Sequence, residues 1–188
     1  LWTITTASHN TVVIDQKEQD HGSPEKPVTG QLKFYDDKDS HVKAIDLDAS
    51  PAYAVAKTYR RRLVMVHAGP GRDYVVDRFD VEGGQDHDWF LHGMCEQEGT
   101  LETSIALDRP LDKTMVPDWG GKEIPKQQSD TDPKHFHPYV FLRDLKTGAI
   151  PEKSWTATWR YDGGVGLRTH NLPQTGTQVF RFRSPSIR

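Results

Sequence analysis

The sequence predicts an all-β fold, in the form of an antiparallel layered β-sandwich with many strands. Short segments of alternating apolar and polar residues, rich in Val, Ile, Thr and aromatic residues, recur along the chain. Glycine-rich turns separate several of them, and no window of comparable length has the 3.6-residue apolar period of a helix. Each strand with one apolar face must bury that face against another layer, so stacked sheets are expected.

Ten segments have the strand pattern. They are, in chain order, Thr11–Asp15, Gln31–Tyr35, Val42–Leu47, Tyr53–His67, Asp73–Val81, Trp89–Gly93, Thr100–Ala106, Ser154–Tyr161, Val165–His170 and Thr177–Arg183. Three turns join neighbouring segments at hairpin distances, with the sequences HAGPGR, EGGQDHD and YDGG. Successive hairpins predict an antiparallel meander.

Length and composition suit this fold class. The chain has 188 residues, of which 35% are hydrophobic, enough for a packed core, and we expect one β-sandwich portion over residues 1–188. A net charge of −3 gives no overall attraction for nucleic acid or for an anionic membrane. The single cysteine, Cys95, excludes an intrachain disulfide.

No apolar run is long enough to span a membrane, and the first residues lack the layout of a signal peptide. Because the chain begins LWTITTASHN, we expect it to be the C-terminal piece of a longer polypeptide.

Three consecutive arginines, Arg60, Arg61 and Arg62, resemble a binding run for an anion. On a strand, however, side chains alternate, so Arg60 and Arg62 project to one face and Arg61 to the other. We therefore expect these arginines to pair with carboxylates such as those of Asp77 and Asp80.

One long irregular segment, Val116–Pro138, contains four prolines and is predicted to be a loop insertion. Trp119 lies in this segment and is followed by two glycines. A flexible aromatic residue of this kind can stack on the apolar face of a sugar ring, so Trp119 is a candidate substrate-binding residue. The alternative is that the Trp119 ring only anchors the loop.

Nine histidines justify a search for a metal site. His87 and His92 are five residues apart, which on a strand places them on opposite faces. His135 and His137 share a face but lie between prolines. The sequence contains no zinc-finger, EF-hand, P-loop or GxSxG pattern, so neither pair identifies a known site.

His9 differs because it comes just before a predicted strand, in the stretch SHNTVVIDQKEQ. Its imidazole can be directed to one face of the sheet there. We expect the neighbouring Asn10 to hydrogen-bond the local backbone and hold that geometry.

This stretch resembles the HNTV-V-D-G-x-x-Q signature of the heparinase II/III-like polysaccharide lyases, in the β-sheet domain after the helical toroid. The stretch Tyr59–Gly93, which contains YVVD and ends in FLHG, is similar to the next conserved part of that family. Trp155–Phe180, beginning WTATWRYDGG, resembles a later part. At Gln16 the family commonly has glycine, so the turn after the strand is expected to differ.

The resemblance implies that His9 is one of three protein ligands of a structural zinc ion, with the other two upstream of Leu1. It also implies that the catalytic residues lie mainly upstream and that the full-length protein is a lyase. Its substrate would be an acidic polysaccharide such as heparin, heparan sulfate or alginate, cleaved by β-elimination at a uronic acid. Such an enzyme is expected to be periplasmic or secreted, and residues 1–188 alone are expected to be inactive.

Two other interpretations remain at this point. In the first, the chain is a non-catalytic carbohydrate-binding β-sandwich, whose exposed tryptophans would be Trp89, Trp119, Trp155 and Trp159. In the second, it is a cupin-type metal enzyme. Cupins need a tight cluster of histidines with a glutamate in one motif, which this sequence does not offer.

Overall fold

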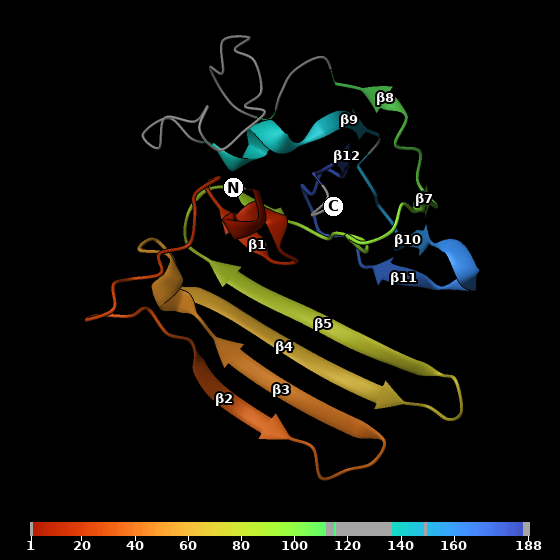
Figure 1. The fold of residues 1–188 in the computed structure, drawn as a ribbon. Coiled ribbons are helices and arrows are strands. Elements are labelled where there is room, and N and C mark those ends of the chain that lie inside the picture. The colour runs from red at the N-terminus through yellow and green to blue at the C-terminus, as the bar shows by residue number, and fades with distance from the viewer. Residues whose placement is uncertain (1, 112–114, 116–136, 149, 186–188) are drawn as a thin grey trace. The chain divides into compact units, whose positions relative to one another are not determined.

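The computed structural model describes residues 2–111, 115, 137–148 and 150–185 (Figure 1). Every strand pair in these residues is antiparallel, and the strands form four sheets. Within the described ranges the helices are short 3-10 turns of three or four residues. The predicted all-β, antiparallel fold class is therefore confirmed.

The chain divides into two compact units. The central unit consists of Thr11–Trp89, and the terminal unit combines Leu1–Asn10 with Phe90–Arg188. The boundary falls inside the SHNTVV stretch, between Asn10 and Thr11, so this stretch contributes residues to both units.

A four-stranded meander dominates the central unit, in the order β2-β3-β4-β5 (Figure 1). Its strands are β2 (Gln31–Asp36), β3 (Val42–Asp48), β4 (Thr58–His67) and β5 (Asp73–Glu82). The HAGPGR turn closes the β4–β5 hairpin, as predicted, because its two glycines, Gly69 and Gly71, supply the positive φ angles that the reversal needs.

A second, two-stranded sheet covers one end of the meander. Strand β1 (Val12–Ile14) pairs with β6 (His87–Trp89). Val12 and Ile14 pack with Tyr53 and Tyr59, and Phe79 and Val81 of β5 lie against the same cluster. Burying each such side chain contributes roughly 1.5–3 kcal/mol. Two stacked antiparallel sheets thus form the core of this unit, which is the layered arrangement that the sequence predicts.

The terminal unit contains two three-stranded sheets. The first is β11-β10-β7, with β7 (Thr100–Thr103), β10 (Trp155–Arg160) and β11 (Gly166–Asn171). The second is β12-β9-β8, with β8 (Arg109–Pro110), β9 (Arg143–Thr147) and β12 (Phe180–Arg183). The unit also contains the 3-10 turns η1 (Trp2–Ile4), η2 (Thr6–Ser8), η5 (Pro138–Phe141) and η6 (Asp162–Gly164).

Most predicted strands are present within a few residues, and the departures have physical reasons. The predicted strand Tyr53–His67 begins only at Thr58, because η3 (Ser50–Ala52) and the turn after it occupy the preceding residues. The predicted strand Trp89–Gly93 is wrong, since β6 ends at Trp89. Strands β8 and β9 were not predicted, because RP and RDLKT lack a clear apolar alternation.

One predicted hairpin is also wrong. EGGQDHD joins β5 to β6, but β6 pairs with β1, so it is a crossover between two sheets. The YDGG turn closes the β10–β11 hairpin as predicted.

Of the predicted loop Val116–Pro138, residues 116–136 lie outside the described residues, together with Trp119 and His135. Pro138 is the first residue of η5. In the part of the chain with described structure, no helix has the length and apolar character needed to cross a membrane.

Candidate functional site

The candidate site begins at the end of the η2 turn, where His9 follows Ser8. The backbone N–H of His9 donates to the carbonyl of Thr6 at 3.1 Å and closes the turn. Thr6 and Ala7 are buried, whereas His9 and Asn10 are exposed. The buried turn therefore presents the two polar side chains at the surface of the terminal unit.

The side chain of Asn10 hydrogen-bonds backbone that is distant in the sequence. The predicted bond was to local backbone. The Oδ1 atom of Asn10 accepts a 2.6 Å hydrogen bond from the backbone N–H of His92, 82 residues away in the sequence. The Nε2–H of His92 in turn donates to the carbonyl of Ala7 at 2.8 Å. These two bonds attach the SHN segment to the FLHG segment.

His92 sits in an aromatic environment. Its ring stacks on Phe90 with a centroid distance of 5.9 Å, and the edges of Trp2 and Phe182 complete the surroundings. Burial lowers the pKa of His92; the bond to Ala7 opposes this, and the nearby charge of His9 lowers the pKa further. His92 is therefore neutral at pH 7, with its proton on Nε2, because that nitrogen faces a carbonyl oxygen.

At Gly93 a third segment, the end of the WTATWRY strand, lies close to the FLHG segment. A Cβ atom added at Gly93 would lie 2.4 Å from the Tyr161 hydroxyl oxygen and 2.6 Å from Cδ1 of Trp159. The same Tyr161 oxygen accepts a 2.6 Å hydrogen bond from the backbone N–H of Met94. The FLHG segment thus fits tightly against the end of the WTATWRY strand, and only glycine leaves room for that contact.

The rest of the SHNTVV stretch is held within the central unit by Tyr59. The Tyr59 hydroxyl donates to the carbonyl of Val12 and lies 2.8 Å from Thr11 Oγ1 and 2.9 Å from Gln19 Nε2. Burial raises the pKa of Tyr59, although these hydrogen bonds oppose the shift. The role of Tyr59 was not predicted from the sequence, because 40 residues or more separate it from these hydrogen-bond partners.

The turn after β1 keeps the backbone geometry that a glycine would favour. Asp15 has a φ of 51° and Gln16 a φ of 56°, and the N–H of Lys17 donates to the carbonyl of Ile14 at 3.0 Å. Two positive φ angles at the centre of a four-residue turn are typical of type I′. The Asp15 carboxylate accepts bonds from the N–H groups of Gln85 and Asp86, which lower its pKa.

The resemblance implies that His9 is one ligand of a zinc site. Zinc in proteins usually has three or four protein ligands. Among residues 2–111, 115, 137–148 and 150–185, no group of three or more His, Cys, Asp or Glu side chains is arranged to hold a metal ion. The Nε2 atom of His92 already donates to Ala7. An exposed His9 side chain is compatible with a shared site whose other ligands come from elsewhere.

The described histidines of the other two predicted pairs have hydrogen-bond partners of their own. His87 donates from Nε2 to the carbonyl of Gly83 at 2.7 Å, and it belongs to the central unit, whereas His92 belongs to the terminal unit. His137 accepts a 3.3 Å bond from the N–H of Tyr139 and caps η5. Its predicted partner His135 lies outside the described residues.

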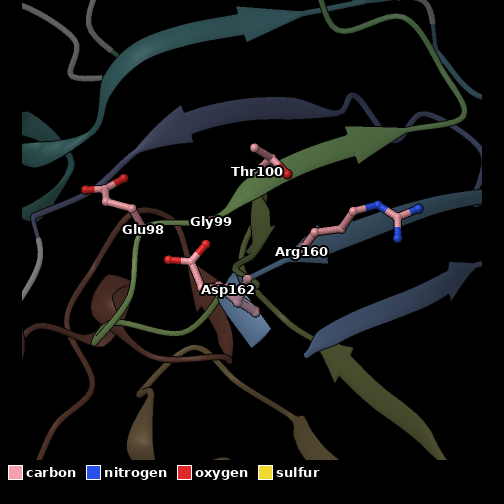
Figure 2. Close-up of a pocket in the computed structure, with 6 residues that line it drawn as sticks. Glu98, Gly99, Thr100, Arg160 and Asp162 are labelled. Atoms are coloured by element: carbon pink, nitrogen blue, oxygen red, sulfur yellow. The ribbon is translucent and has the colours of Figure 1, made fainter. Parts of the chain in front are cut away.

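A shallow pocket of about 290 Å³ in the terminal unit is lined by Glu98, Gly99, Thr100, Arg160, Tyr161 and Asp162. Figure 2 shows the carboxylates of Glu98 and Asp162 on one side and the guanidinium of Arg160 directed away from them. Arg160 donates to Glu102 at 3.1 Å. Because carboxylates outnumber the guanidinium, this pocket does not favour an anionic polymer.

Of the four tryptophans named in the carbohydrate-binding interpretation, the structure describes three, and these belong to two different units. Trp155 and Trp159 lie on the same face of β10, with the buried Ala157 between them, and both are half-buried. Trp89 is 48% exposed but belongs to the other unit. Trp119 lies outside the described residues.

The arginine run pairs with carboxylates, as predicted. Arg60 and Arg62 share the carboxylate of Asp46, which is 7% exposed, and Arg62 also reaches Asp80 at 3.2 Å. Arg61 projects to the opposite face, where it binds Asp77 at 2.6 Å. The hydrogen bonds from Arg60 and Arg62 lower the pKa of Asp46. These pairs hold neighbouring strands of the meander together and leave no run of unpaired arginines.

Comparisons with models of known protein families and with curated proteins give no match.

Proposed function

We propose that this chain is the β-sheet portion of a polysaccharide lyase that cleaves a uronic-acid-containing polysaccharide by β-elimination. One observation carries the proposal. Each of the three stretches that resemble the heparinase II/III-like lyases contributes one end, SHN, FLHG or WTATWRY, and these ends are in contact within one unit through Asn10–His92, His92–Ala7 and Gly93–Tyr161. Motif residues that are far apart in sequence but adjacent in space support a shared structural role around His9.

The chemistry explains why the chain would act with other parts of the protein. The C5 proton of a uronate is a weak acid, so its removal requires neutralisation of the neighbouring carboxylate, which stabilises the enolate-like transition state. A base must then take the proton, and an acid must protonate the leaving glycosidic oxygen. We assign these groups to a helical domain outside residues 1–188, because the resemblance to the heparinase II/III-like lyases implies that they lie mainly upstream of this sheet portion.

His9 has a supporting role in this proposal. The imidazole would be one ligand of a structural zinc ion that braces the sheet beside the substrate groove. The neutral ring of His92 and the amide of Asn10 hold the segment that carries His9. The enzyme would be periplasmic or secreted, where acidic polysaccharides are encountered.

The test uses the full-length gene product and a panel of heparin, heparan sulfate and alginate. Formation of the unsaturated uronate is followed by its ultraviolet absorbance. We expect turnover of at least one polymer by the full-length protein and none by residues 1–188 alone. The zinc content of the full-length protein should fall in the H9A variant and remain unchanged in H170A, which alters an exposed histidine on β11.

Turnover by residues 1–188 alone would contradict the placement of the catalytic groups. If the full-length protein bound these polymers without cleaving any of them, the carbohydrate-binding interpretation would replace the lyase.

A further inference from the structure

Two histidines face each other at one end of the meander. Val42 pairs with Val66, so the next pair is His41, just before β3, and His67, the last residue of β4. The N–H of His67 donates to the carbonyl of His41 at 2.7 Å. Directly opposite residues of an antiparallel pair project to the same face. The ring centres are 6.1 Å apart, with the planes inclined at 39°.

The Nδ1 side of each ring already has a polar partner. His67 Nδ1 bonds the carboxylate of Asp73, and His41 Nδ1 lies 3.1 Å from Ser40 Oγ and 3.8 Å from Asp39 Oδ1. Histidine ligands of metals usually donate one ring N–H to a carboxylate or another oxygen, which sets the tautomer and makes the other nitrogen more basic. In both rings that other nitrogen is Nε2, and neither Nε2 has a hydrogen-bond partner within the described part of the chain.

The backbone under the pair is also held in place. The carboxylate of Asp39 accepts bonds from the N–H groups of His41 and Val42, at 2.6 and 3.2 Å. These bonds lower the pKa of Asp39, so it stays ionised beside the ring. The side chains of His41 and His67 are 71% and 47% exposed, which gives a cation direct access from solvent. Figure 1 shows the end of the sheet where the β2–β3 and β4–β5 turns lie.

We propose that His41 and His67 form a two-imidazole site for a divalent transition-metal cation of the Ni²⁺, Cu²⁺ and Zn²⁺ group, with water in the remaining positions. Imidazole nitrogen suits these cations, whereas Mg²⁺ and Ca²⁺ prefer oxygen. A cation about 2.0–2.1 Å from both Nε2 atoms needs ring centres about 5–6 Å apart, which is close to the observed 6.1 Å.

This site is independent of the proposed lyase activity and of His9, which belongs to the other unit. A bound cation would link the ends of β3 and β4. Because an unfolded chain cannot hold the two rings in this geometry, binding would also stabilise the folded state.

The test titrates the untagged 188-residue chain with NiCl₂ in a calorimeter. We expect one site, weakened about tenfold or more by H41A and by H67A. The double variant should bind no more weakly than either single variant, because each substitution alone abolishes the chelate. D73N, which removes the carboxylate behind His67, should weaken binding less than H67A does. H21A and H170A, which change exposed histidines elsewhere, are matched controls and should bind as the parent chain does.

A second measurement is the thermal unfolding midpoint. Ni²⁺ should raise it in the parent chain and in H9A, and leave it unchanged in H41A. The changed side chains are exposed, and circular dichroism verifies that each variant is folded. The proposal is overturned if the chain does not bind Ni²⁺, if H41A and H67A bind it as tightly as the parent chain, or if H9A abolishes binding.

Discussion

The side chain of Asn10 accepts a 2.6 Å hydrogen bond from the backbone N–H of His92, and the two residues are 82 positions apart in the chain. This bond joins the segment that carries His9 to the segment that carries the partly buried imidazole of His92. It explains why an asparagine directly follows His9: a short side chain with an acceptor oxygen reaches the second segment without displacing the turn.

Replacement of Asn10 by alanine should lower the free energy of unfolding by about 1 kcal/mol, because the N–H of His92 loses its acceptor. The Asn10→Asp variant retains an oxygen at the same position and should lose less. Urea denaturation of both variants against the parent chain measures the difference. Equal stabilities for the alanine and aspartate variants would show that the bond contributes nothing.

The Gly93→Ala variant should be destabilised by about 1–3 kcal/mol, because the new methyl group overlaps Tyr161 and Trp159. Gly30→Ala is the matched control. A Cβ there would meet its nearest neighbour, the carbonyl oxygen of Asp48, at 3.4 Å. Chemical denaturation of both variants gives the comparison, and a loss at Gly30 as large as that at Gly93 would argue against the steric explanation.

Replacement of Gln16 by glycine should stabilise the protein by about 0.5–1 kcal/mol. Gln16 has a φ of 56°. At this angle the steric cost of a side chain exceeds the additional conformational entropy that glycine loses on folding. Lys17→Gly, at the next position, lacks this benefit and should give no gain. The thermal unfolding midpoints of the two variants test this, and the idea fails if Gln16→Gly melts at or below the parent temperature.

The stability of the protein should fall as the pH falls below about 6.5, in part because of His92. Burial lowers the pKa of His92 in the folded state, so the unfolded state binds a proton first as the solution is acidified. The contribution of His92 to stability is fully present above the pKa of the unfolded state. It is lost as the pH falls through the lower pKa of the folded state.

The measurement is the free energy of unfolding between pH 8 and pH 5. The His92→Gln variant should show a smaller decrease over this range than the parent chain, because it lacks the partly buried imidazole. His170→Ala, which removes an exposed ring, should show the same decrease as the parent chain. If the parent and His92→Gln curves are parallel, His92 does not contribute to the acid sensitivity.

Part of the candidate site could be read from local sequence. The neighbours of His9 mark it as a candidate, and strand alternation predicts that Arg61 faces away from Arg60 and Arg62. The partner of Asn10, the role of Tyr59 and the facing rings of His41 and His67 could not be predicted, because each depends on which distant strands become neighbours.

The amino-acid sequence by itself determined the all-β class, most of the strands and the two glycine-rich hairpins, because alternation and turn chemistry act over a few residues. Only the tertiary structure decided that β6 pairs with β1, that the chain divides between Asn10 and Thr11, and which polar side chains meet. Pairing between distant strands depends on how apolar faces are buried together, and that burial is a property of the whole packed unit.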